Sequence, residues 1–235
     1  MPVDLADGTM GRMPSAHLVD PAHLASLLAR ASSLVSSGRR TLLGIAGAPG
    51  AGKTTLAEQL VEALLEDPPT GLGPDAVVHL PMDGFHLADV QLDRLGLLGR
   101  KGAPETFDAH GYRAVLDRIS ADDGHTVFVP GFERQLEQPL AAAIAIEPAA
   151  RFVVTEGNYL LLDKKPWSQL HERFGEVWFV ELADTERLRR LIARHVEFGK
   201  PPGAAQAWAL GPDQANADQV VASRARADLV ITPSG

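Results

Sequence analysis

The 235-residue chain contains no cysteine, which excludes disulfide bonds, thiolate catalysis and cysteine-based zinc sites. Long apolar runs are also missing: none approaches the roughly 20 residues that a membrane-spanning helix needs. The N-terminal residues lack the apolar core of a signal peptide. Basic residues are few, with 22 Lys and Arg against 30 Asp and Glu, whereas a protein that binds nucleic acid through phosphate contacts needs the opposite balance. We therefore expect a cytoplasmic protein with neither a nucleic-acid nor a membrane partner.

Three functional motifs are absent as well. The eight histidines show neither H-x-H nor H-E-x-x-H spacing, so a histidine-based metal cluster is not expected. No G-x-S-x-G sequence occurs, so serine hydrolase chemistry has no support. None of the five lysines is followed two residues later by Asp, so the chain lacks the Asn/Thr-Lys-x-Asp element of guanine-specific switches. The remaining composition, with 45% hydrophobic residues, is that of an ordinary globular protein.

Hydrophobic patterning predicts a flexible segment over residues 1–19 and a single α/β domain over residues 20–235. The predicted strands are 41–46, 76–80, 126–129, 143–146, 152–155, 177–181 and 228–232, and the predicted helices are 21–37, 53–66, 109–120, 184–198 and 213–223. The strand pair 126–129 and 143–146 surrounds a polar insert. We expect irregular structure over 87–103 and a break at 201–203. Strands separated by helices favour a parallel sheet with right-handed crossovers.

Eight consecutive residues match the phosphate-binding pattern G-x-x-x-x-G-K-[ST] in full, between a predicted strand and a predicted helix. Glycines let backbone N–H groups converge on phosphates, and the helix N-terminus adds partial positive charge. Lys53 would reach the β- and γ-phosphates of ATP, and the Thr54 hydroxyl would ligate Mg²⁺. The alternative is a glycine-rich turn that binds nothing. The predicted nucleotide-binding residues are Gly47, Ala48, Pro49, Gly50, Ala51, Gly52, Lys53, Thr54 and Thr55.

Acidic residues follow two further predicted strands. Asp83 comes just after the second strand, and the carboxyl ends of parallel strands share one edge of a sheet, where ligands bind. A carboxylate there can accept the proton of a substrate alcohol that attacks phosphorus. Glu156 ends another buried strand, where a carboxylate can hold Mg²⁺ directly or through water. The alternatives are an ordinary Asp-Gly turn at Asp83 and a solvated carboxylate at Glu156.

Three arginines lie on one face of the predicted helix 184–198, because Arg187, Arg190 and Arg194 are spaced by three and four residues. Guanidinium groups on one face suit clamping of phosphates and stabilisation of charge during phosphoryl transfer. We predict a lid over residues 184–203 in which Arg190 and Arg194 serve catalysis. The alternative is a solvated charged face, which is common in a chain with 17 arginines.

Four other residues are candidate contacts to an acceptor substrate. His86 lies three residues after the predicted base and is the only histidine that we place near the chemistry. Arg134 stands in the polar insert, where it could shape an acceptor pocket or be an exposed loop residue. Asn158 and Tyr159 follow the predicted magnesium ligand and could form hydrogen bonds to substrate or to protein.

Four segments occur in an order that resembles one known family. They are the phosphate-binding sequence 47–54, the Asp-Gly-Phe-His element 83–86, the Lys-Gly-Ala-Pro-Glu-Thr-Phe-Asp element 101–108 and the Glu-Gly-Asn-Tyr-Leu element 156–160. This order is similar to that of the P-loop kinases of the type I pantothenate kinase, uridine kinase and phosphoribulokinase family, and most similar to its bacterial nucleoside/nucleotide kinase-like, fructose-transport-associated branch. The resemblance implies a three-layer P-loop NTPase sandwich with a five-stranded parallel sheet, a small inserted strand pair and an arginine-bearing lid helix.

The resemblance also implies roles. It matches Asp83 to the acid that serves as base or orients the acceptor, Glu156 to the acid near Mg²⁺, and Arg190 and Arg194 to lid arginines. It implies a phosphotransferase that uses ATP and Mg²⁺ and phosphorylates an alcohol group of a small metabolite, and homodimers are common in the family. Pantothenate, a nucleoside and a sugar each present a primary alcohol, so the acceptor stays open. The alternatives are a regulatory P-loop NTPase switch without a small-molecule acceptor and a nucleotide-binding module without turnover.

Overall fold

The centre of the structure, a computed structural model that describes residues 18–35 and 39–233, is a five-stranded sheet. Its strand order is β2 (Val77–Pro81), β5 (Phe152–Glu156), β1 (Thr41–Gly47), β6 (Glu176–Val180) and β7 (Leu229–Ile231). Every neighbouring pair in this sheet is parallel, which confirms the predicted topology. The carboxyl ends of β1, β2 and β5 therefore meet at one edge, where the acids and the glycine-rich sequence were expected.

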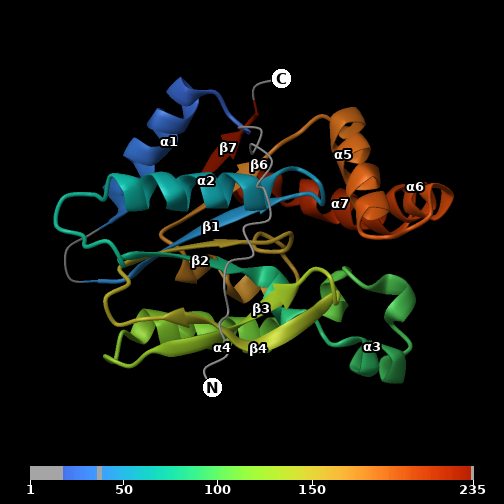
Figure 1. The fold of residues 1–235 in the computed structure, drawn as a ribbon, viewed down its shortest axis with the longest axis horizontal. Helices are drawn as coiled ribbons and strands as arrows, with labels where there is room; N and C mark the ends of the chain where they lie inside the picture. The colour runs from blue at the N-terminus through green and yellow to red at the C-terminus, as the bar shows by residue number, and fades with distance from the viewer. Residues whose placement is uncertain (1–17, 36–38, 234–235) are drawn as a thin grey trace, which may run out of the picture.

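Two layers of helices cover the sheet (Figure 1). One layer contains α1 (Pro21–Leu34) and α2 (Lys53–Glu66), and the other contains α4 (Ala109–Ala121) and α7 (Pro212–Ala222). Side chains of β1 alternate between them: Leu43 and Ile45 join the core under α1 and α2, whereas Leu42 and Ala46 join the opposite core. Burial on both faces explains why this strand is a nearly continuous apolar run in the sequence.

A two-stranded antiparallel hairpin, β3 (Val127–Glu133) and β4 (Gln138–Ile146), follows α4. The sequence predicted the pair but made its strands too short, because the polar insert forms the outer half of the hairpin rather than a separate loop. The pairing register shifts between Val129 and Gly131. Pro130 lies at this shift, and its missing N–H cannot contribute to a regular ladder. A proline inside a strand therefore marks a bulge here and not the end of the strand.

Two helices occur where the sequence predicted none. α3 (Asp89–Leu95) lies in the stretch expected to be irregular, and α6 (Pro202–Leu210) starts at the expected break. Pro202 occupies the first turn of α6, where a missing N–H removes no helical hydrogen bond. The predicted lid helix is present as α5 (Asp184–Glu197) and packs against α6. Among the helices of the described chain, none has the length and apolar character needed to cross a membrane.

The described chain begins with Leu18 and Val19, whose side chains are buried. Leu18 lies so close to Gly52 that a Cβ on this glycine would come within 2.5 Å of a leucine methyl carbon. These two residues end the predicted flexible segment 1–19, and its remainder, 1–17, lies outside the described residues. The glycine at position 52 is thus required by a close contact as well as by its backbone conformation.

Candidate active site

The glycine-rich sequence forms the turn between β1 and α2. Gly50 and Gly52 have φ values of +82° and +97°, in the left-handed region that favours glycine. A Cβ on Gly50 would lie 2.9 Å from the backbone oxygen of Arg187, so the turn packs closely against α5. Because α2 begins at Lys53, the unpaired N–H groups of its first turn lie next to the turn. Together these backbone groups form a site for an anionic phosphate.

Lys53 is buried beside the loop that it follows, with 7% of its surface exposed. Its Nζ donates a hydrogen bond of 3.2 Å to the carbonyl of Ala48. Burial lowers the pKa of Lys53 to about 8, although the charges of Glu156 and Asp83 oppose this decrease. The ammonium is therefore charged at neutral pH but poorly solvated. A bound phosphate would provide the counter-charge and the hydrogen-bond acceptors that this ammonium lacks.

Glu156 ends β5 beside the start of α2. The Thr54 hydroxyl donates to its Oε1 over 3.0 Å, so the two predicted magnesium ligands lie together. Burial and the charge of Asp83 raise the pKa of Glu156 to about 7, while Lys53 and the Thr54 hydrogen bond act in the opposite direction. A hydroxyl and a buried carboxylate are oxygen donors of the kind that Mg²⁺ prefers. The two residues therefore fit a divalent cation held next to the phosphates.

We expect Mg²⁺ to strengthen binding of a non-hydrolysable ATP analogue by a factor that rises with pH and levels off above about pH 7. The cation needs the charged carboxylate, whereas burial favours the protonated form of Glu156 below that pH. Calorimetric titrations with and without Mg²⁺ between pH 6 and 8 measure the factor. In the Glu156→Gln variant, the factor by which Mg²⁺ strengthens binding should be about tenfold smaller at pH 8. Its pH dependence should then be that of the free nucleotide alone. An unaltered profile in this variant would contradict the assignment.

Asp83 lies in a short 3-10 turn (Met82–Phe85) after β2, and His86 follows this turn. Nδ1 of His86 lies 2.8 Å from the carbonyl oxygen of Asp83, so Nδ1–H donates and Nε2 remains an acceptor. Burial lowers the pKa of His86, which keeps the ring neutral at pH 7. Its centre lies 3.9 Å from that of the Phe107 ring. Within the described chain the Asp83 carboxylate has no hydrogen bond, so it can accept one from a ligand.

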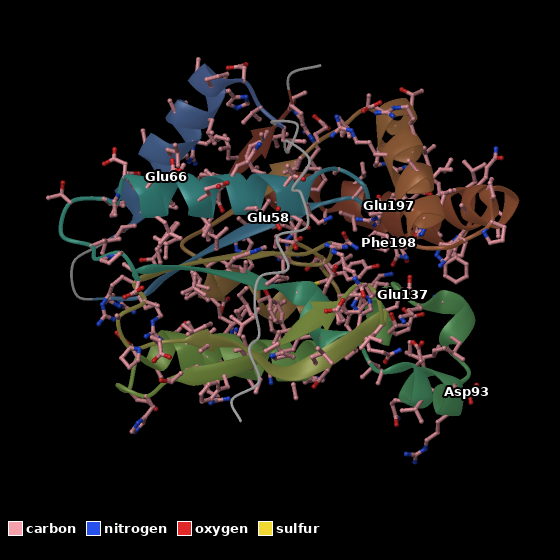
Figure 2. All side chains as sticks on the ribbon, in the orientation of Figure 1. Glu58, Glu66, Asp93, Glu137, Glu197 and Phe198 are labelled. Carbon is pink, nitrogen blue, oxygen red and sulfur yellow. The ribbon has the colours of Figure 1, made fainter. Side chains whose placement is uncertain are left out.

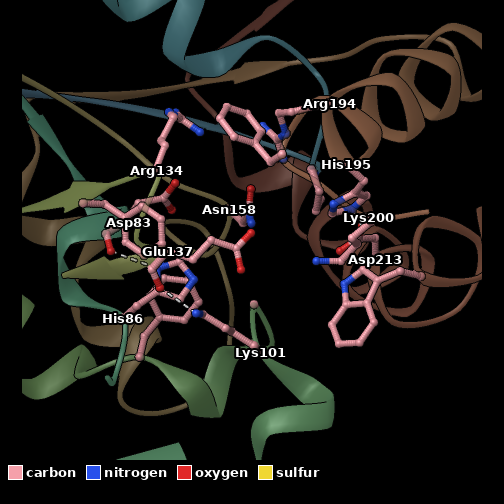
Figure 3. Close-up of a pocket in the computed structure, with 16 residues that line it drawn as sticks. Asp83, His86, Lys101, Arg134, Glu137, Asn158, Arg194, His195, Lys200 and Asp213 are labelled. Carbon is pink, nitrogen blue, oxygen red and sulfur yellow. Dashed lines mark hydrogen bonds and ion pairs between the residues drawn. The ribbon is translucent and has the colours of Figure 1, made fainter. Parts of the chain in front are cut away.

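Two adjoining cavities open at this edge of the sheet. The donor cavity, of about 380 Å³, lies at the glycine-rich loop and the start of α2. The acceptor cavity, of about 170 Å³, contains Asp83 and lies between the hairpin and helices α5 to α7 (Figure 3). Arg134, Arg194 and Phe198 line both cavities. Figure 2 shows Phe198 and Glu137, of the hairpin turn, on facing sides of this region. The shared wall is where a nucleotide phosphate and a second molecule can meet.

The predicted acceptor contacts have different surroundings. His86, Arg134 and Asn158 line the acceptor cavity. Tyr159 is fully buried, and its hydroxyl donates to the carbonyl of Gly102 while its ring packs against two other aromatic rings. The Tyr159 side chain therefore lies in the core behind the cavity rather than in its wall. It was predicted because it neighbours a polar element, and position in the sequence does not show on which side of the chain it packs.

Arg190 and Arg194 line the cavities, as the lid hypothesis requires. Arg190 lines the donor cavity, and its Nε donates to Glu186 over 2.6 Å. Arg194 lines both cavities, and its guanidinium has no hydrogen bond or ion pair with any described residue. Guanidinium groups on the wall of a cavity have the chemistry needed to bind a phosphate there.

Arg187, one turn earlier on α5, is only 1% exposed and joins three elements. It donates to the carbonyl of Pro49 in the glycine-rich loop over 3.3 Å, to Asp184 at the start of α5 over 2.9 Å and to Gln214 of α7 over 2.5 Å. The side chain therefore fixes the position of the lid helix relative to the loop. It is a structural link rather than a phosphate ligand.

We expect Arg187→Met to lower the free energy of unfolding by about 2–3 kcal/mol, because the substitution leaves polar groups of the loop and of α7 without their partner. Urea denaturation measures this change. Arg189→Met is the matched control, since Arg189 lies on the same helix and also pairs with an acid, but 68% of its side chain is exposed. Arg189→Met should therefore change the free energy of unfolding only slightly. Equal losses in the two variants would contradict the proposed link.

Sequence reasoning missed much of the acceptor cavity. The missed residues are His195, Phe198, Lys200, Trp208 and Asp213. His195 and Asp213 pair through Nε2 and Oδ2 at 2.7 Å, which joins α5 to α7. The Nζ of Lys200 lies 5.4 Å from the centre of the Trp208 ring. Nothing in the spacing of these five residues indicated that the packing of α5, α6 and α7 brings them together.

A parallel sheet whose first strand leads through a glycine-rich loop into a helix, with acids after two neighbouring strands, defines the class of P-loop kinases. Solved structures agree. The structure of a protein from Silicibacter sp. TM1040, provisionally described as a fructose transport system kinase, has a TM-score of 0.79 and 36% identity, and the match covers 88% of this chain and 98% of that one. YFH7 from Saccharomyces cerevisiae has a TM-score of 0.77, and at 18% identity it supports the fold alone.

Sequence comparisons lead to the same group, although no protein-family model matches the chain. A Schizosaccharomyces pombe protein provisionally named a uridine kinase is 32% identical in an alignment 174 residues long, which covers 72% of each chain. The ATP-dependent kinase-like protein notR' of Aspergillus versicolor is 36% identical in an alignment 152 residues long, which covers 61% of this chain and 88% of that one. The chain belongs to the family of P-loop kinases related to uridine kinase and YFH7.

Proposed function

We propose that the protein transfers the γ-phosphoryl group of ATP to a hydroxyl group of a small metabolite. The observation that carries this proposal is the position of Asp83 in the wall of a cavity that adjoins the donor cavity. A kinase needs such a second cavity beside the nucleotide phosphates, whereas a switch that only hydrolyses ATP does not. The name of the Aspergillus relative supports ATP as the phosphoryl donor.

The reaction follows from the residues around the shared wall. Asp83 accepts the proton of the acceptor hydroxyl as the hydroxyl oxygen forms its bond to the γ-phosphorus. The bond from the γ-phosphorus to the bridging oxygen breaks, and its electron pair leaves with ADP. Lys53, Arg190 and Arg194 stabilise the charge on the phosphoryl oxygens. A magnesium ion held by Thr54 and Glu156 would neutralise further phosphate charge.

The lid would also protect the phosphoryl group from water. Helices α5 and α6 form one wall of the acceptor cavity, opposite the hairpin. A bound acceptor would fill the space between these walls and leave little room for a competing water molecule. Phosphoryl transfer to water should therefore be slow compared with transfer to the correct alcohol.

The walls of the acceptor cavity indicate what it can hold. The rings of Phe107, Phe132 and Trp208 supply flat apolar surface, while Asn158 and Glu137 supply hydrogen-bonding groups. Such a combination suits a small molecule with several polar groups and one apolar face. Pantothenate, a nucleoside and a sugar all meet this description, and all three carry a primary alcohol.

The test is a screen of these three classes of alcohol in a coupled assay that records ADP release. A kinase should release ADP at least tenfold faster with its acceptor than without one, and mass spectrometry should find the phosphorylated alcohol. Lys53→Ala serves as the control for contaminating kinases. Rapid ADP release that no alcohol accelerates would contradict the proposal and favour a P-loop NTPase without a small-molecule acceptor.

A further inference from the structure

Arg134 occupies a distinctive position in the site. It follows the last residue of β3 in the hairpin, on the opposite side of the acceptor cavity from the lid (Figure 3). Arg134 and Arg194 are the two cations that line both the donor cavity and the acceptor cavity in the described chain. A side chain at this junction contacts any chemical group that moves from one cavity to the other. In the proposed reaction the group that moves is the transferred phosphoryl.

Neither guanidinium at the junction is neutralised by the protein. Within the described residues, no hydrogen bond or ion pair reaches the side chains of Arg134 and Arg194, and both are exposed. Arg189, which is also exposed, is by contrast paired with Glu186 through two hydrogen bonds. Two unpaired positive charges that face the same junction repel each other, and an anion bound between them would remove this repulsion.

Both arginines lie at the cavity that the phosphate-binding residues form. Arg134 and Arg194 line the donor cavity together with Gly52, Lys53 and Thr54. An anion held there by Lys53 and the first turn of α2 therefore shares the cavity with both guanidinium groups.

A pair of arginines suits the charge of the transferred phosphoryl group. The charge of a phosphoryl in transit is spread over three equatorial oxygens. Lys53 approaches from the loop, Arg194 from the lid and Arg134 from the hairpin, so the three cations come from three different sides. A guanidinium is planar and always charged, and it binds two phosphate oxygens at once.

We propose that Arg134 binds the terminal phosphoryl group of ATP, opposite Arg194, and is a catalytic residue rather than one that selects the acceptor. The proposal rests on the kinase function proposed above. It assigns the hairpin a second role, because the element that encloses the acceptor also supplies a charge to the reacting phosphorus. Acceptor binding and correct placement of Arg134 would then depend on each other.

Calorimetric titration with ADP and with the non-hydrolysable analogue AMP-PNP, both with Mg²⁺, tests this without knowledge of the acceptor. We expect Arg134→Gln to weaken AMP-PNP binding about tenfold and to change ADP binding less than about twofold, because ADP lacks the terminal phosphoryl. Arg134→Lys should retain part of the wild-type preference for AMP-PNP over ADP. Arg94→Gln is the matched control: it removes the same charge from an exposed arginine on α3 that lines neither cavity.

The proposal is overturned if Arg134→Gln leaves AMP-PNP binding unchanged, or if it weakens ADP and AMP-PNP binding equally. Unchanged nucleotide binding combined with a higher KM for the acceptor would identify Arg134 as an acceptor contact instead. Failure of the underlying kinase proposal has a different signature, because the wild-type protein itself would then not bind AMP-PNP or would release ADP without an acceptor. A urea denaturation curve that matches the wild type shows that the variant is folded.

Discussion

Replacement of Asp83 by asparagine is expected to lower kcat for phosphoryl transfer by about 10³-fold while the Kd for ATP changes less than about twofold. Asparagine has the shape of aspartate but cannot accept the proton of the acceptor hydroxyl. No described residue forms a hydrogen bond to the Asp83 carboxylate, so the substitution breaks no contact within the fold. Single-turnover transfer and equilibrium ATP binding, measured on the same preparation, separate the two effects.

Asp93→Asn provides the control for this variant, because Asp93 is an exposed carboxylate on α3 that lines neither cavity (Figure 2). It should leave both quantities unchanged. A second effect is specific to Asp83: its charge contributes to the raised pKa of Glu156, so its removal should shift the pH dependence of the Mg²⁺ effect to lower pH. If ATP hydrolysis without an acceptor were fast and were unaffected by Asp83→Asn, a switch or NTPase would be the better description.

The parts of the fold that the sequence predicted are those that depend on neighbouring residues in the chain. Strand β1 could be predicted because both of its faces are buried, so that apolar residues follow one another without interruption. The phosphate-binding loop could be predicted because its chemistry needs glycines at fixed spacing next to a lysine. Asp83 and Glu156 were predicted from topology, since parallel strands align their carboxyl ends, and the structure brings both to the loop.

The arginines of α5 show where such reasoning ends. Helical spacing placed Arg187, Arg190 and Arg194 on one face, but the face passes from a buried contact with the glycine-rich loop at Arg187 to an exposed position at Arg194. This difference arises because α5 crosses the loop only at its first turns. The angle of that crossing depends on the packing of α5 against α6 and on its hydrogen bonds to Gln214 and Asp213 of α7. The spacing of residues within a single helix contains no information on this crossing angle.

The wall of the acceptor cavity was the least predictable part. His195 of α5 and Asp213 of α7 are 18 positions apart, and Lys200, between α5 and α6, lies 8 positions before its contact Trp208 of α6. For Arg134 the sequence left open whether it shapes an acceptor pocket or is an exposed loop residue, and in the structure it lies in the turn of the hairpin and lines the acceptor cavity. Binding sites assembled from several elements depend on tertiary packing, so their composition follows only once the elements have been placed.

The titrations of Glu156 and Lys53 together predict a narrow pH range for nucleotide binding. The Mg²⁺ site needs a deprotonated Glu156, and this requirement is met above about pH 7. Phosphate binding needs a protonated Lys53, whose pKa is lowered to about 8 by burial. ATP adds negative charge beside this ammonium and raises its pKa, so binding takes up a proton when the pH exceeds about 8. The affinity for Mg²⁺–ATP should therefore be greatest between these two values.

Replacement of Lys53 by methionine tests the alkaline side of this range and is expected to lower kcat by about 10²–10³-fold. In the wild type, the affinity for Mg²⁺–ATP should be constant between about pH 7 and pH 8 and fall above pH 8, by at most about tenfold per pH unit. Lys53→Met should bind ATP weakly at every pH and lose the decrease above pH 8. Lys53→Arg keeps the charge at all these pH values, so its affinity should also stay constant above pH 8, at a higher level than that of the methionine variant.

The stability of the Lys53→Met variant separates a functional effect from damage to the fold. The charged form of Lys53 is disfavoured in the folded protein, because its pKa is lower there than the ordinary value of 10.5. This destabilisation is fully present below about pH 8 and fades as the pH rises toward the ordinary value. Methionine has a similar length and no charge, so the variant should be at least as stable as the wild type at pH 7. A clear loss of stability in Lys53→Met would mean that the hydrogen bond to the carbonyl of Ala48 outweighs the cost of burying this ammonium, and that the side chain has a structural role.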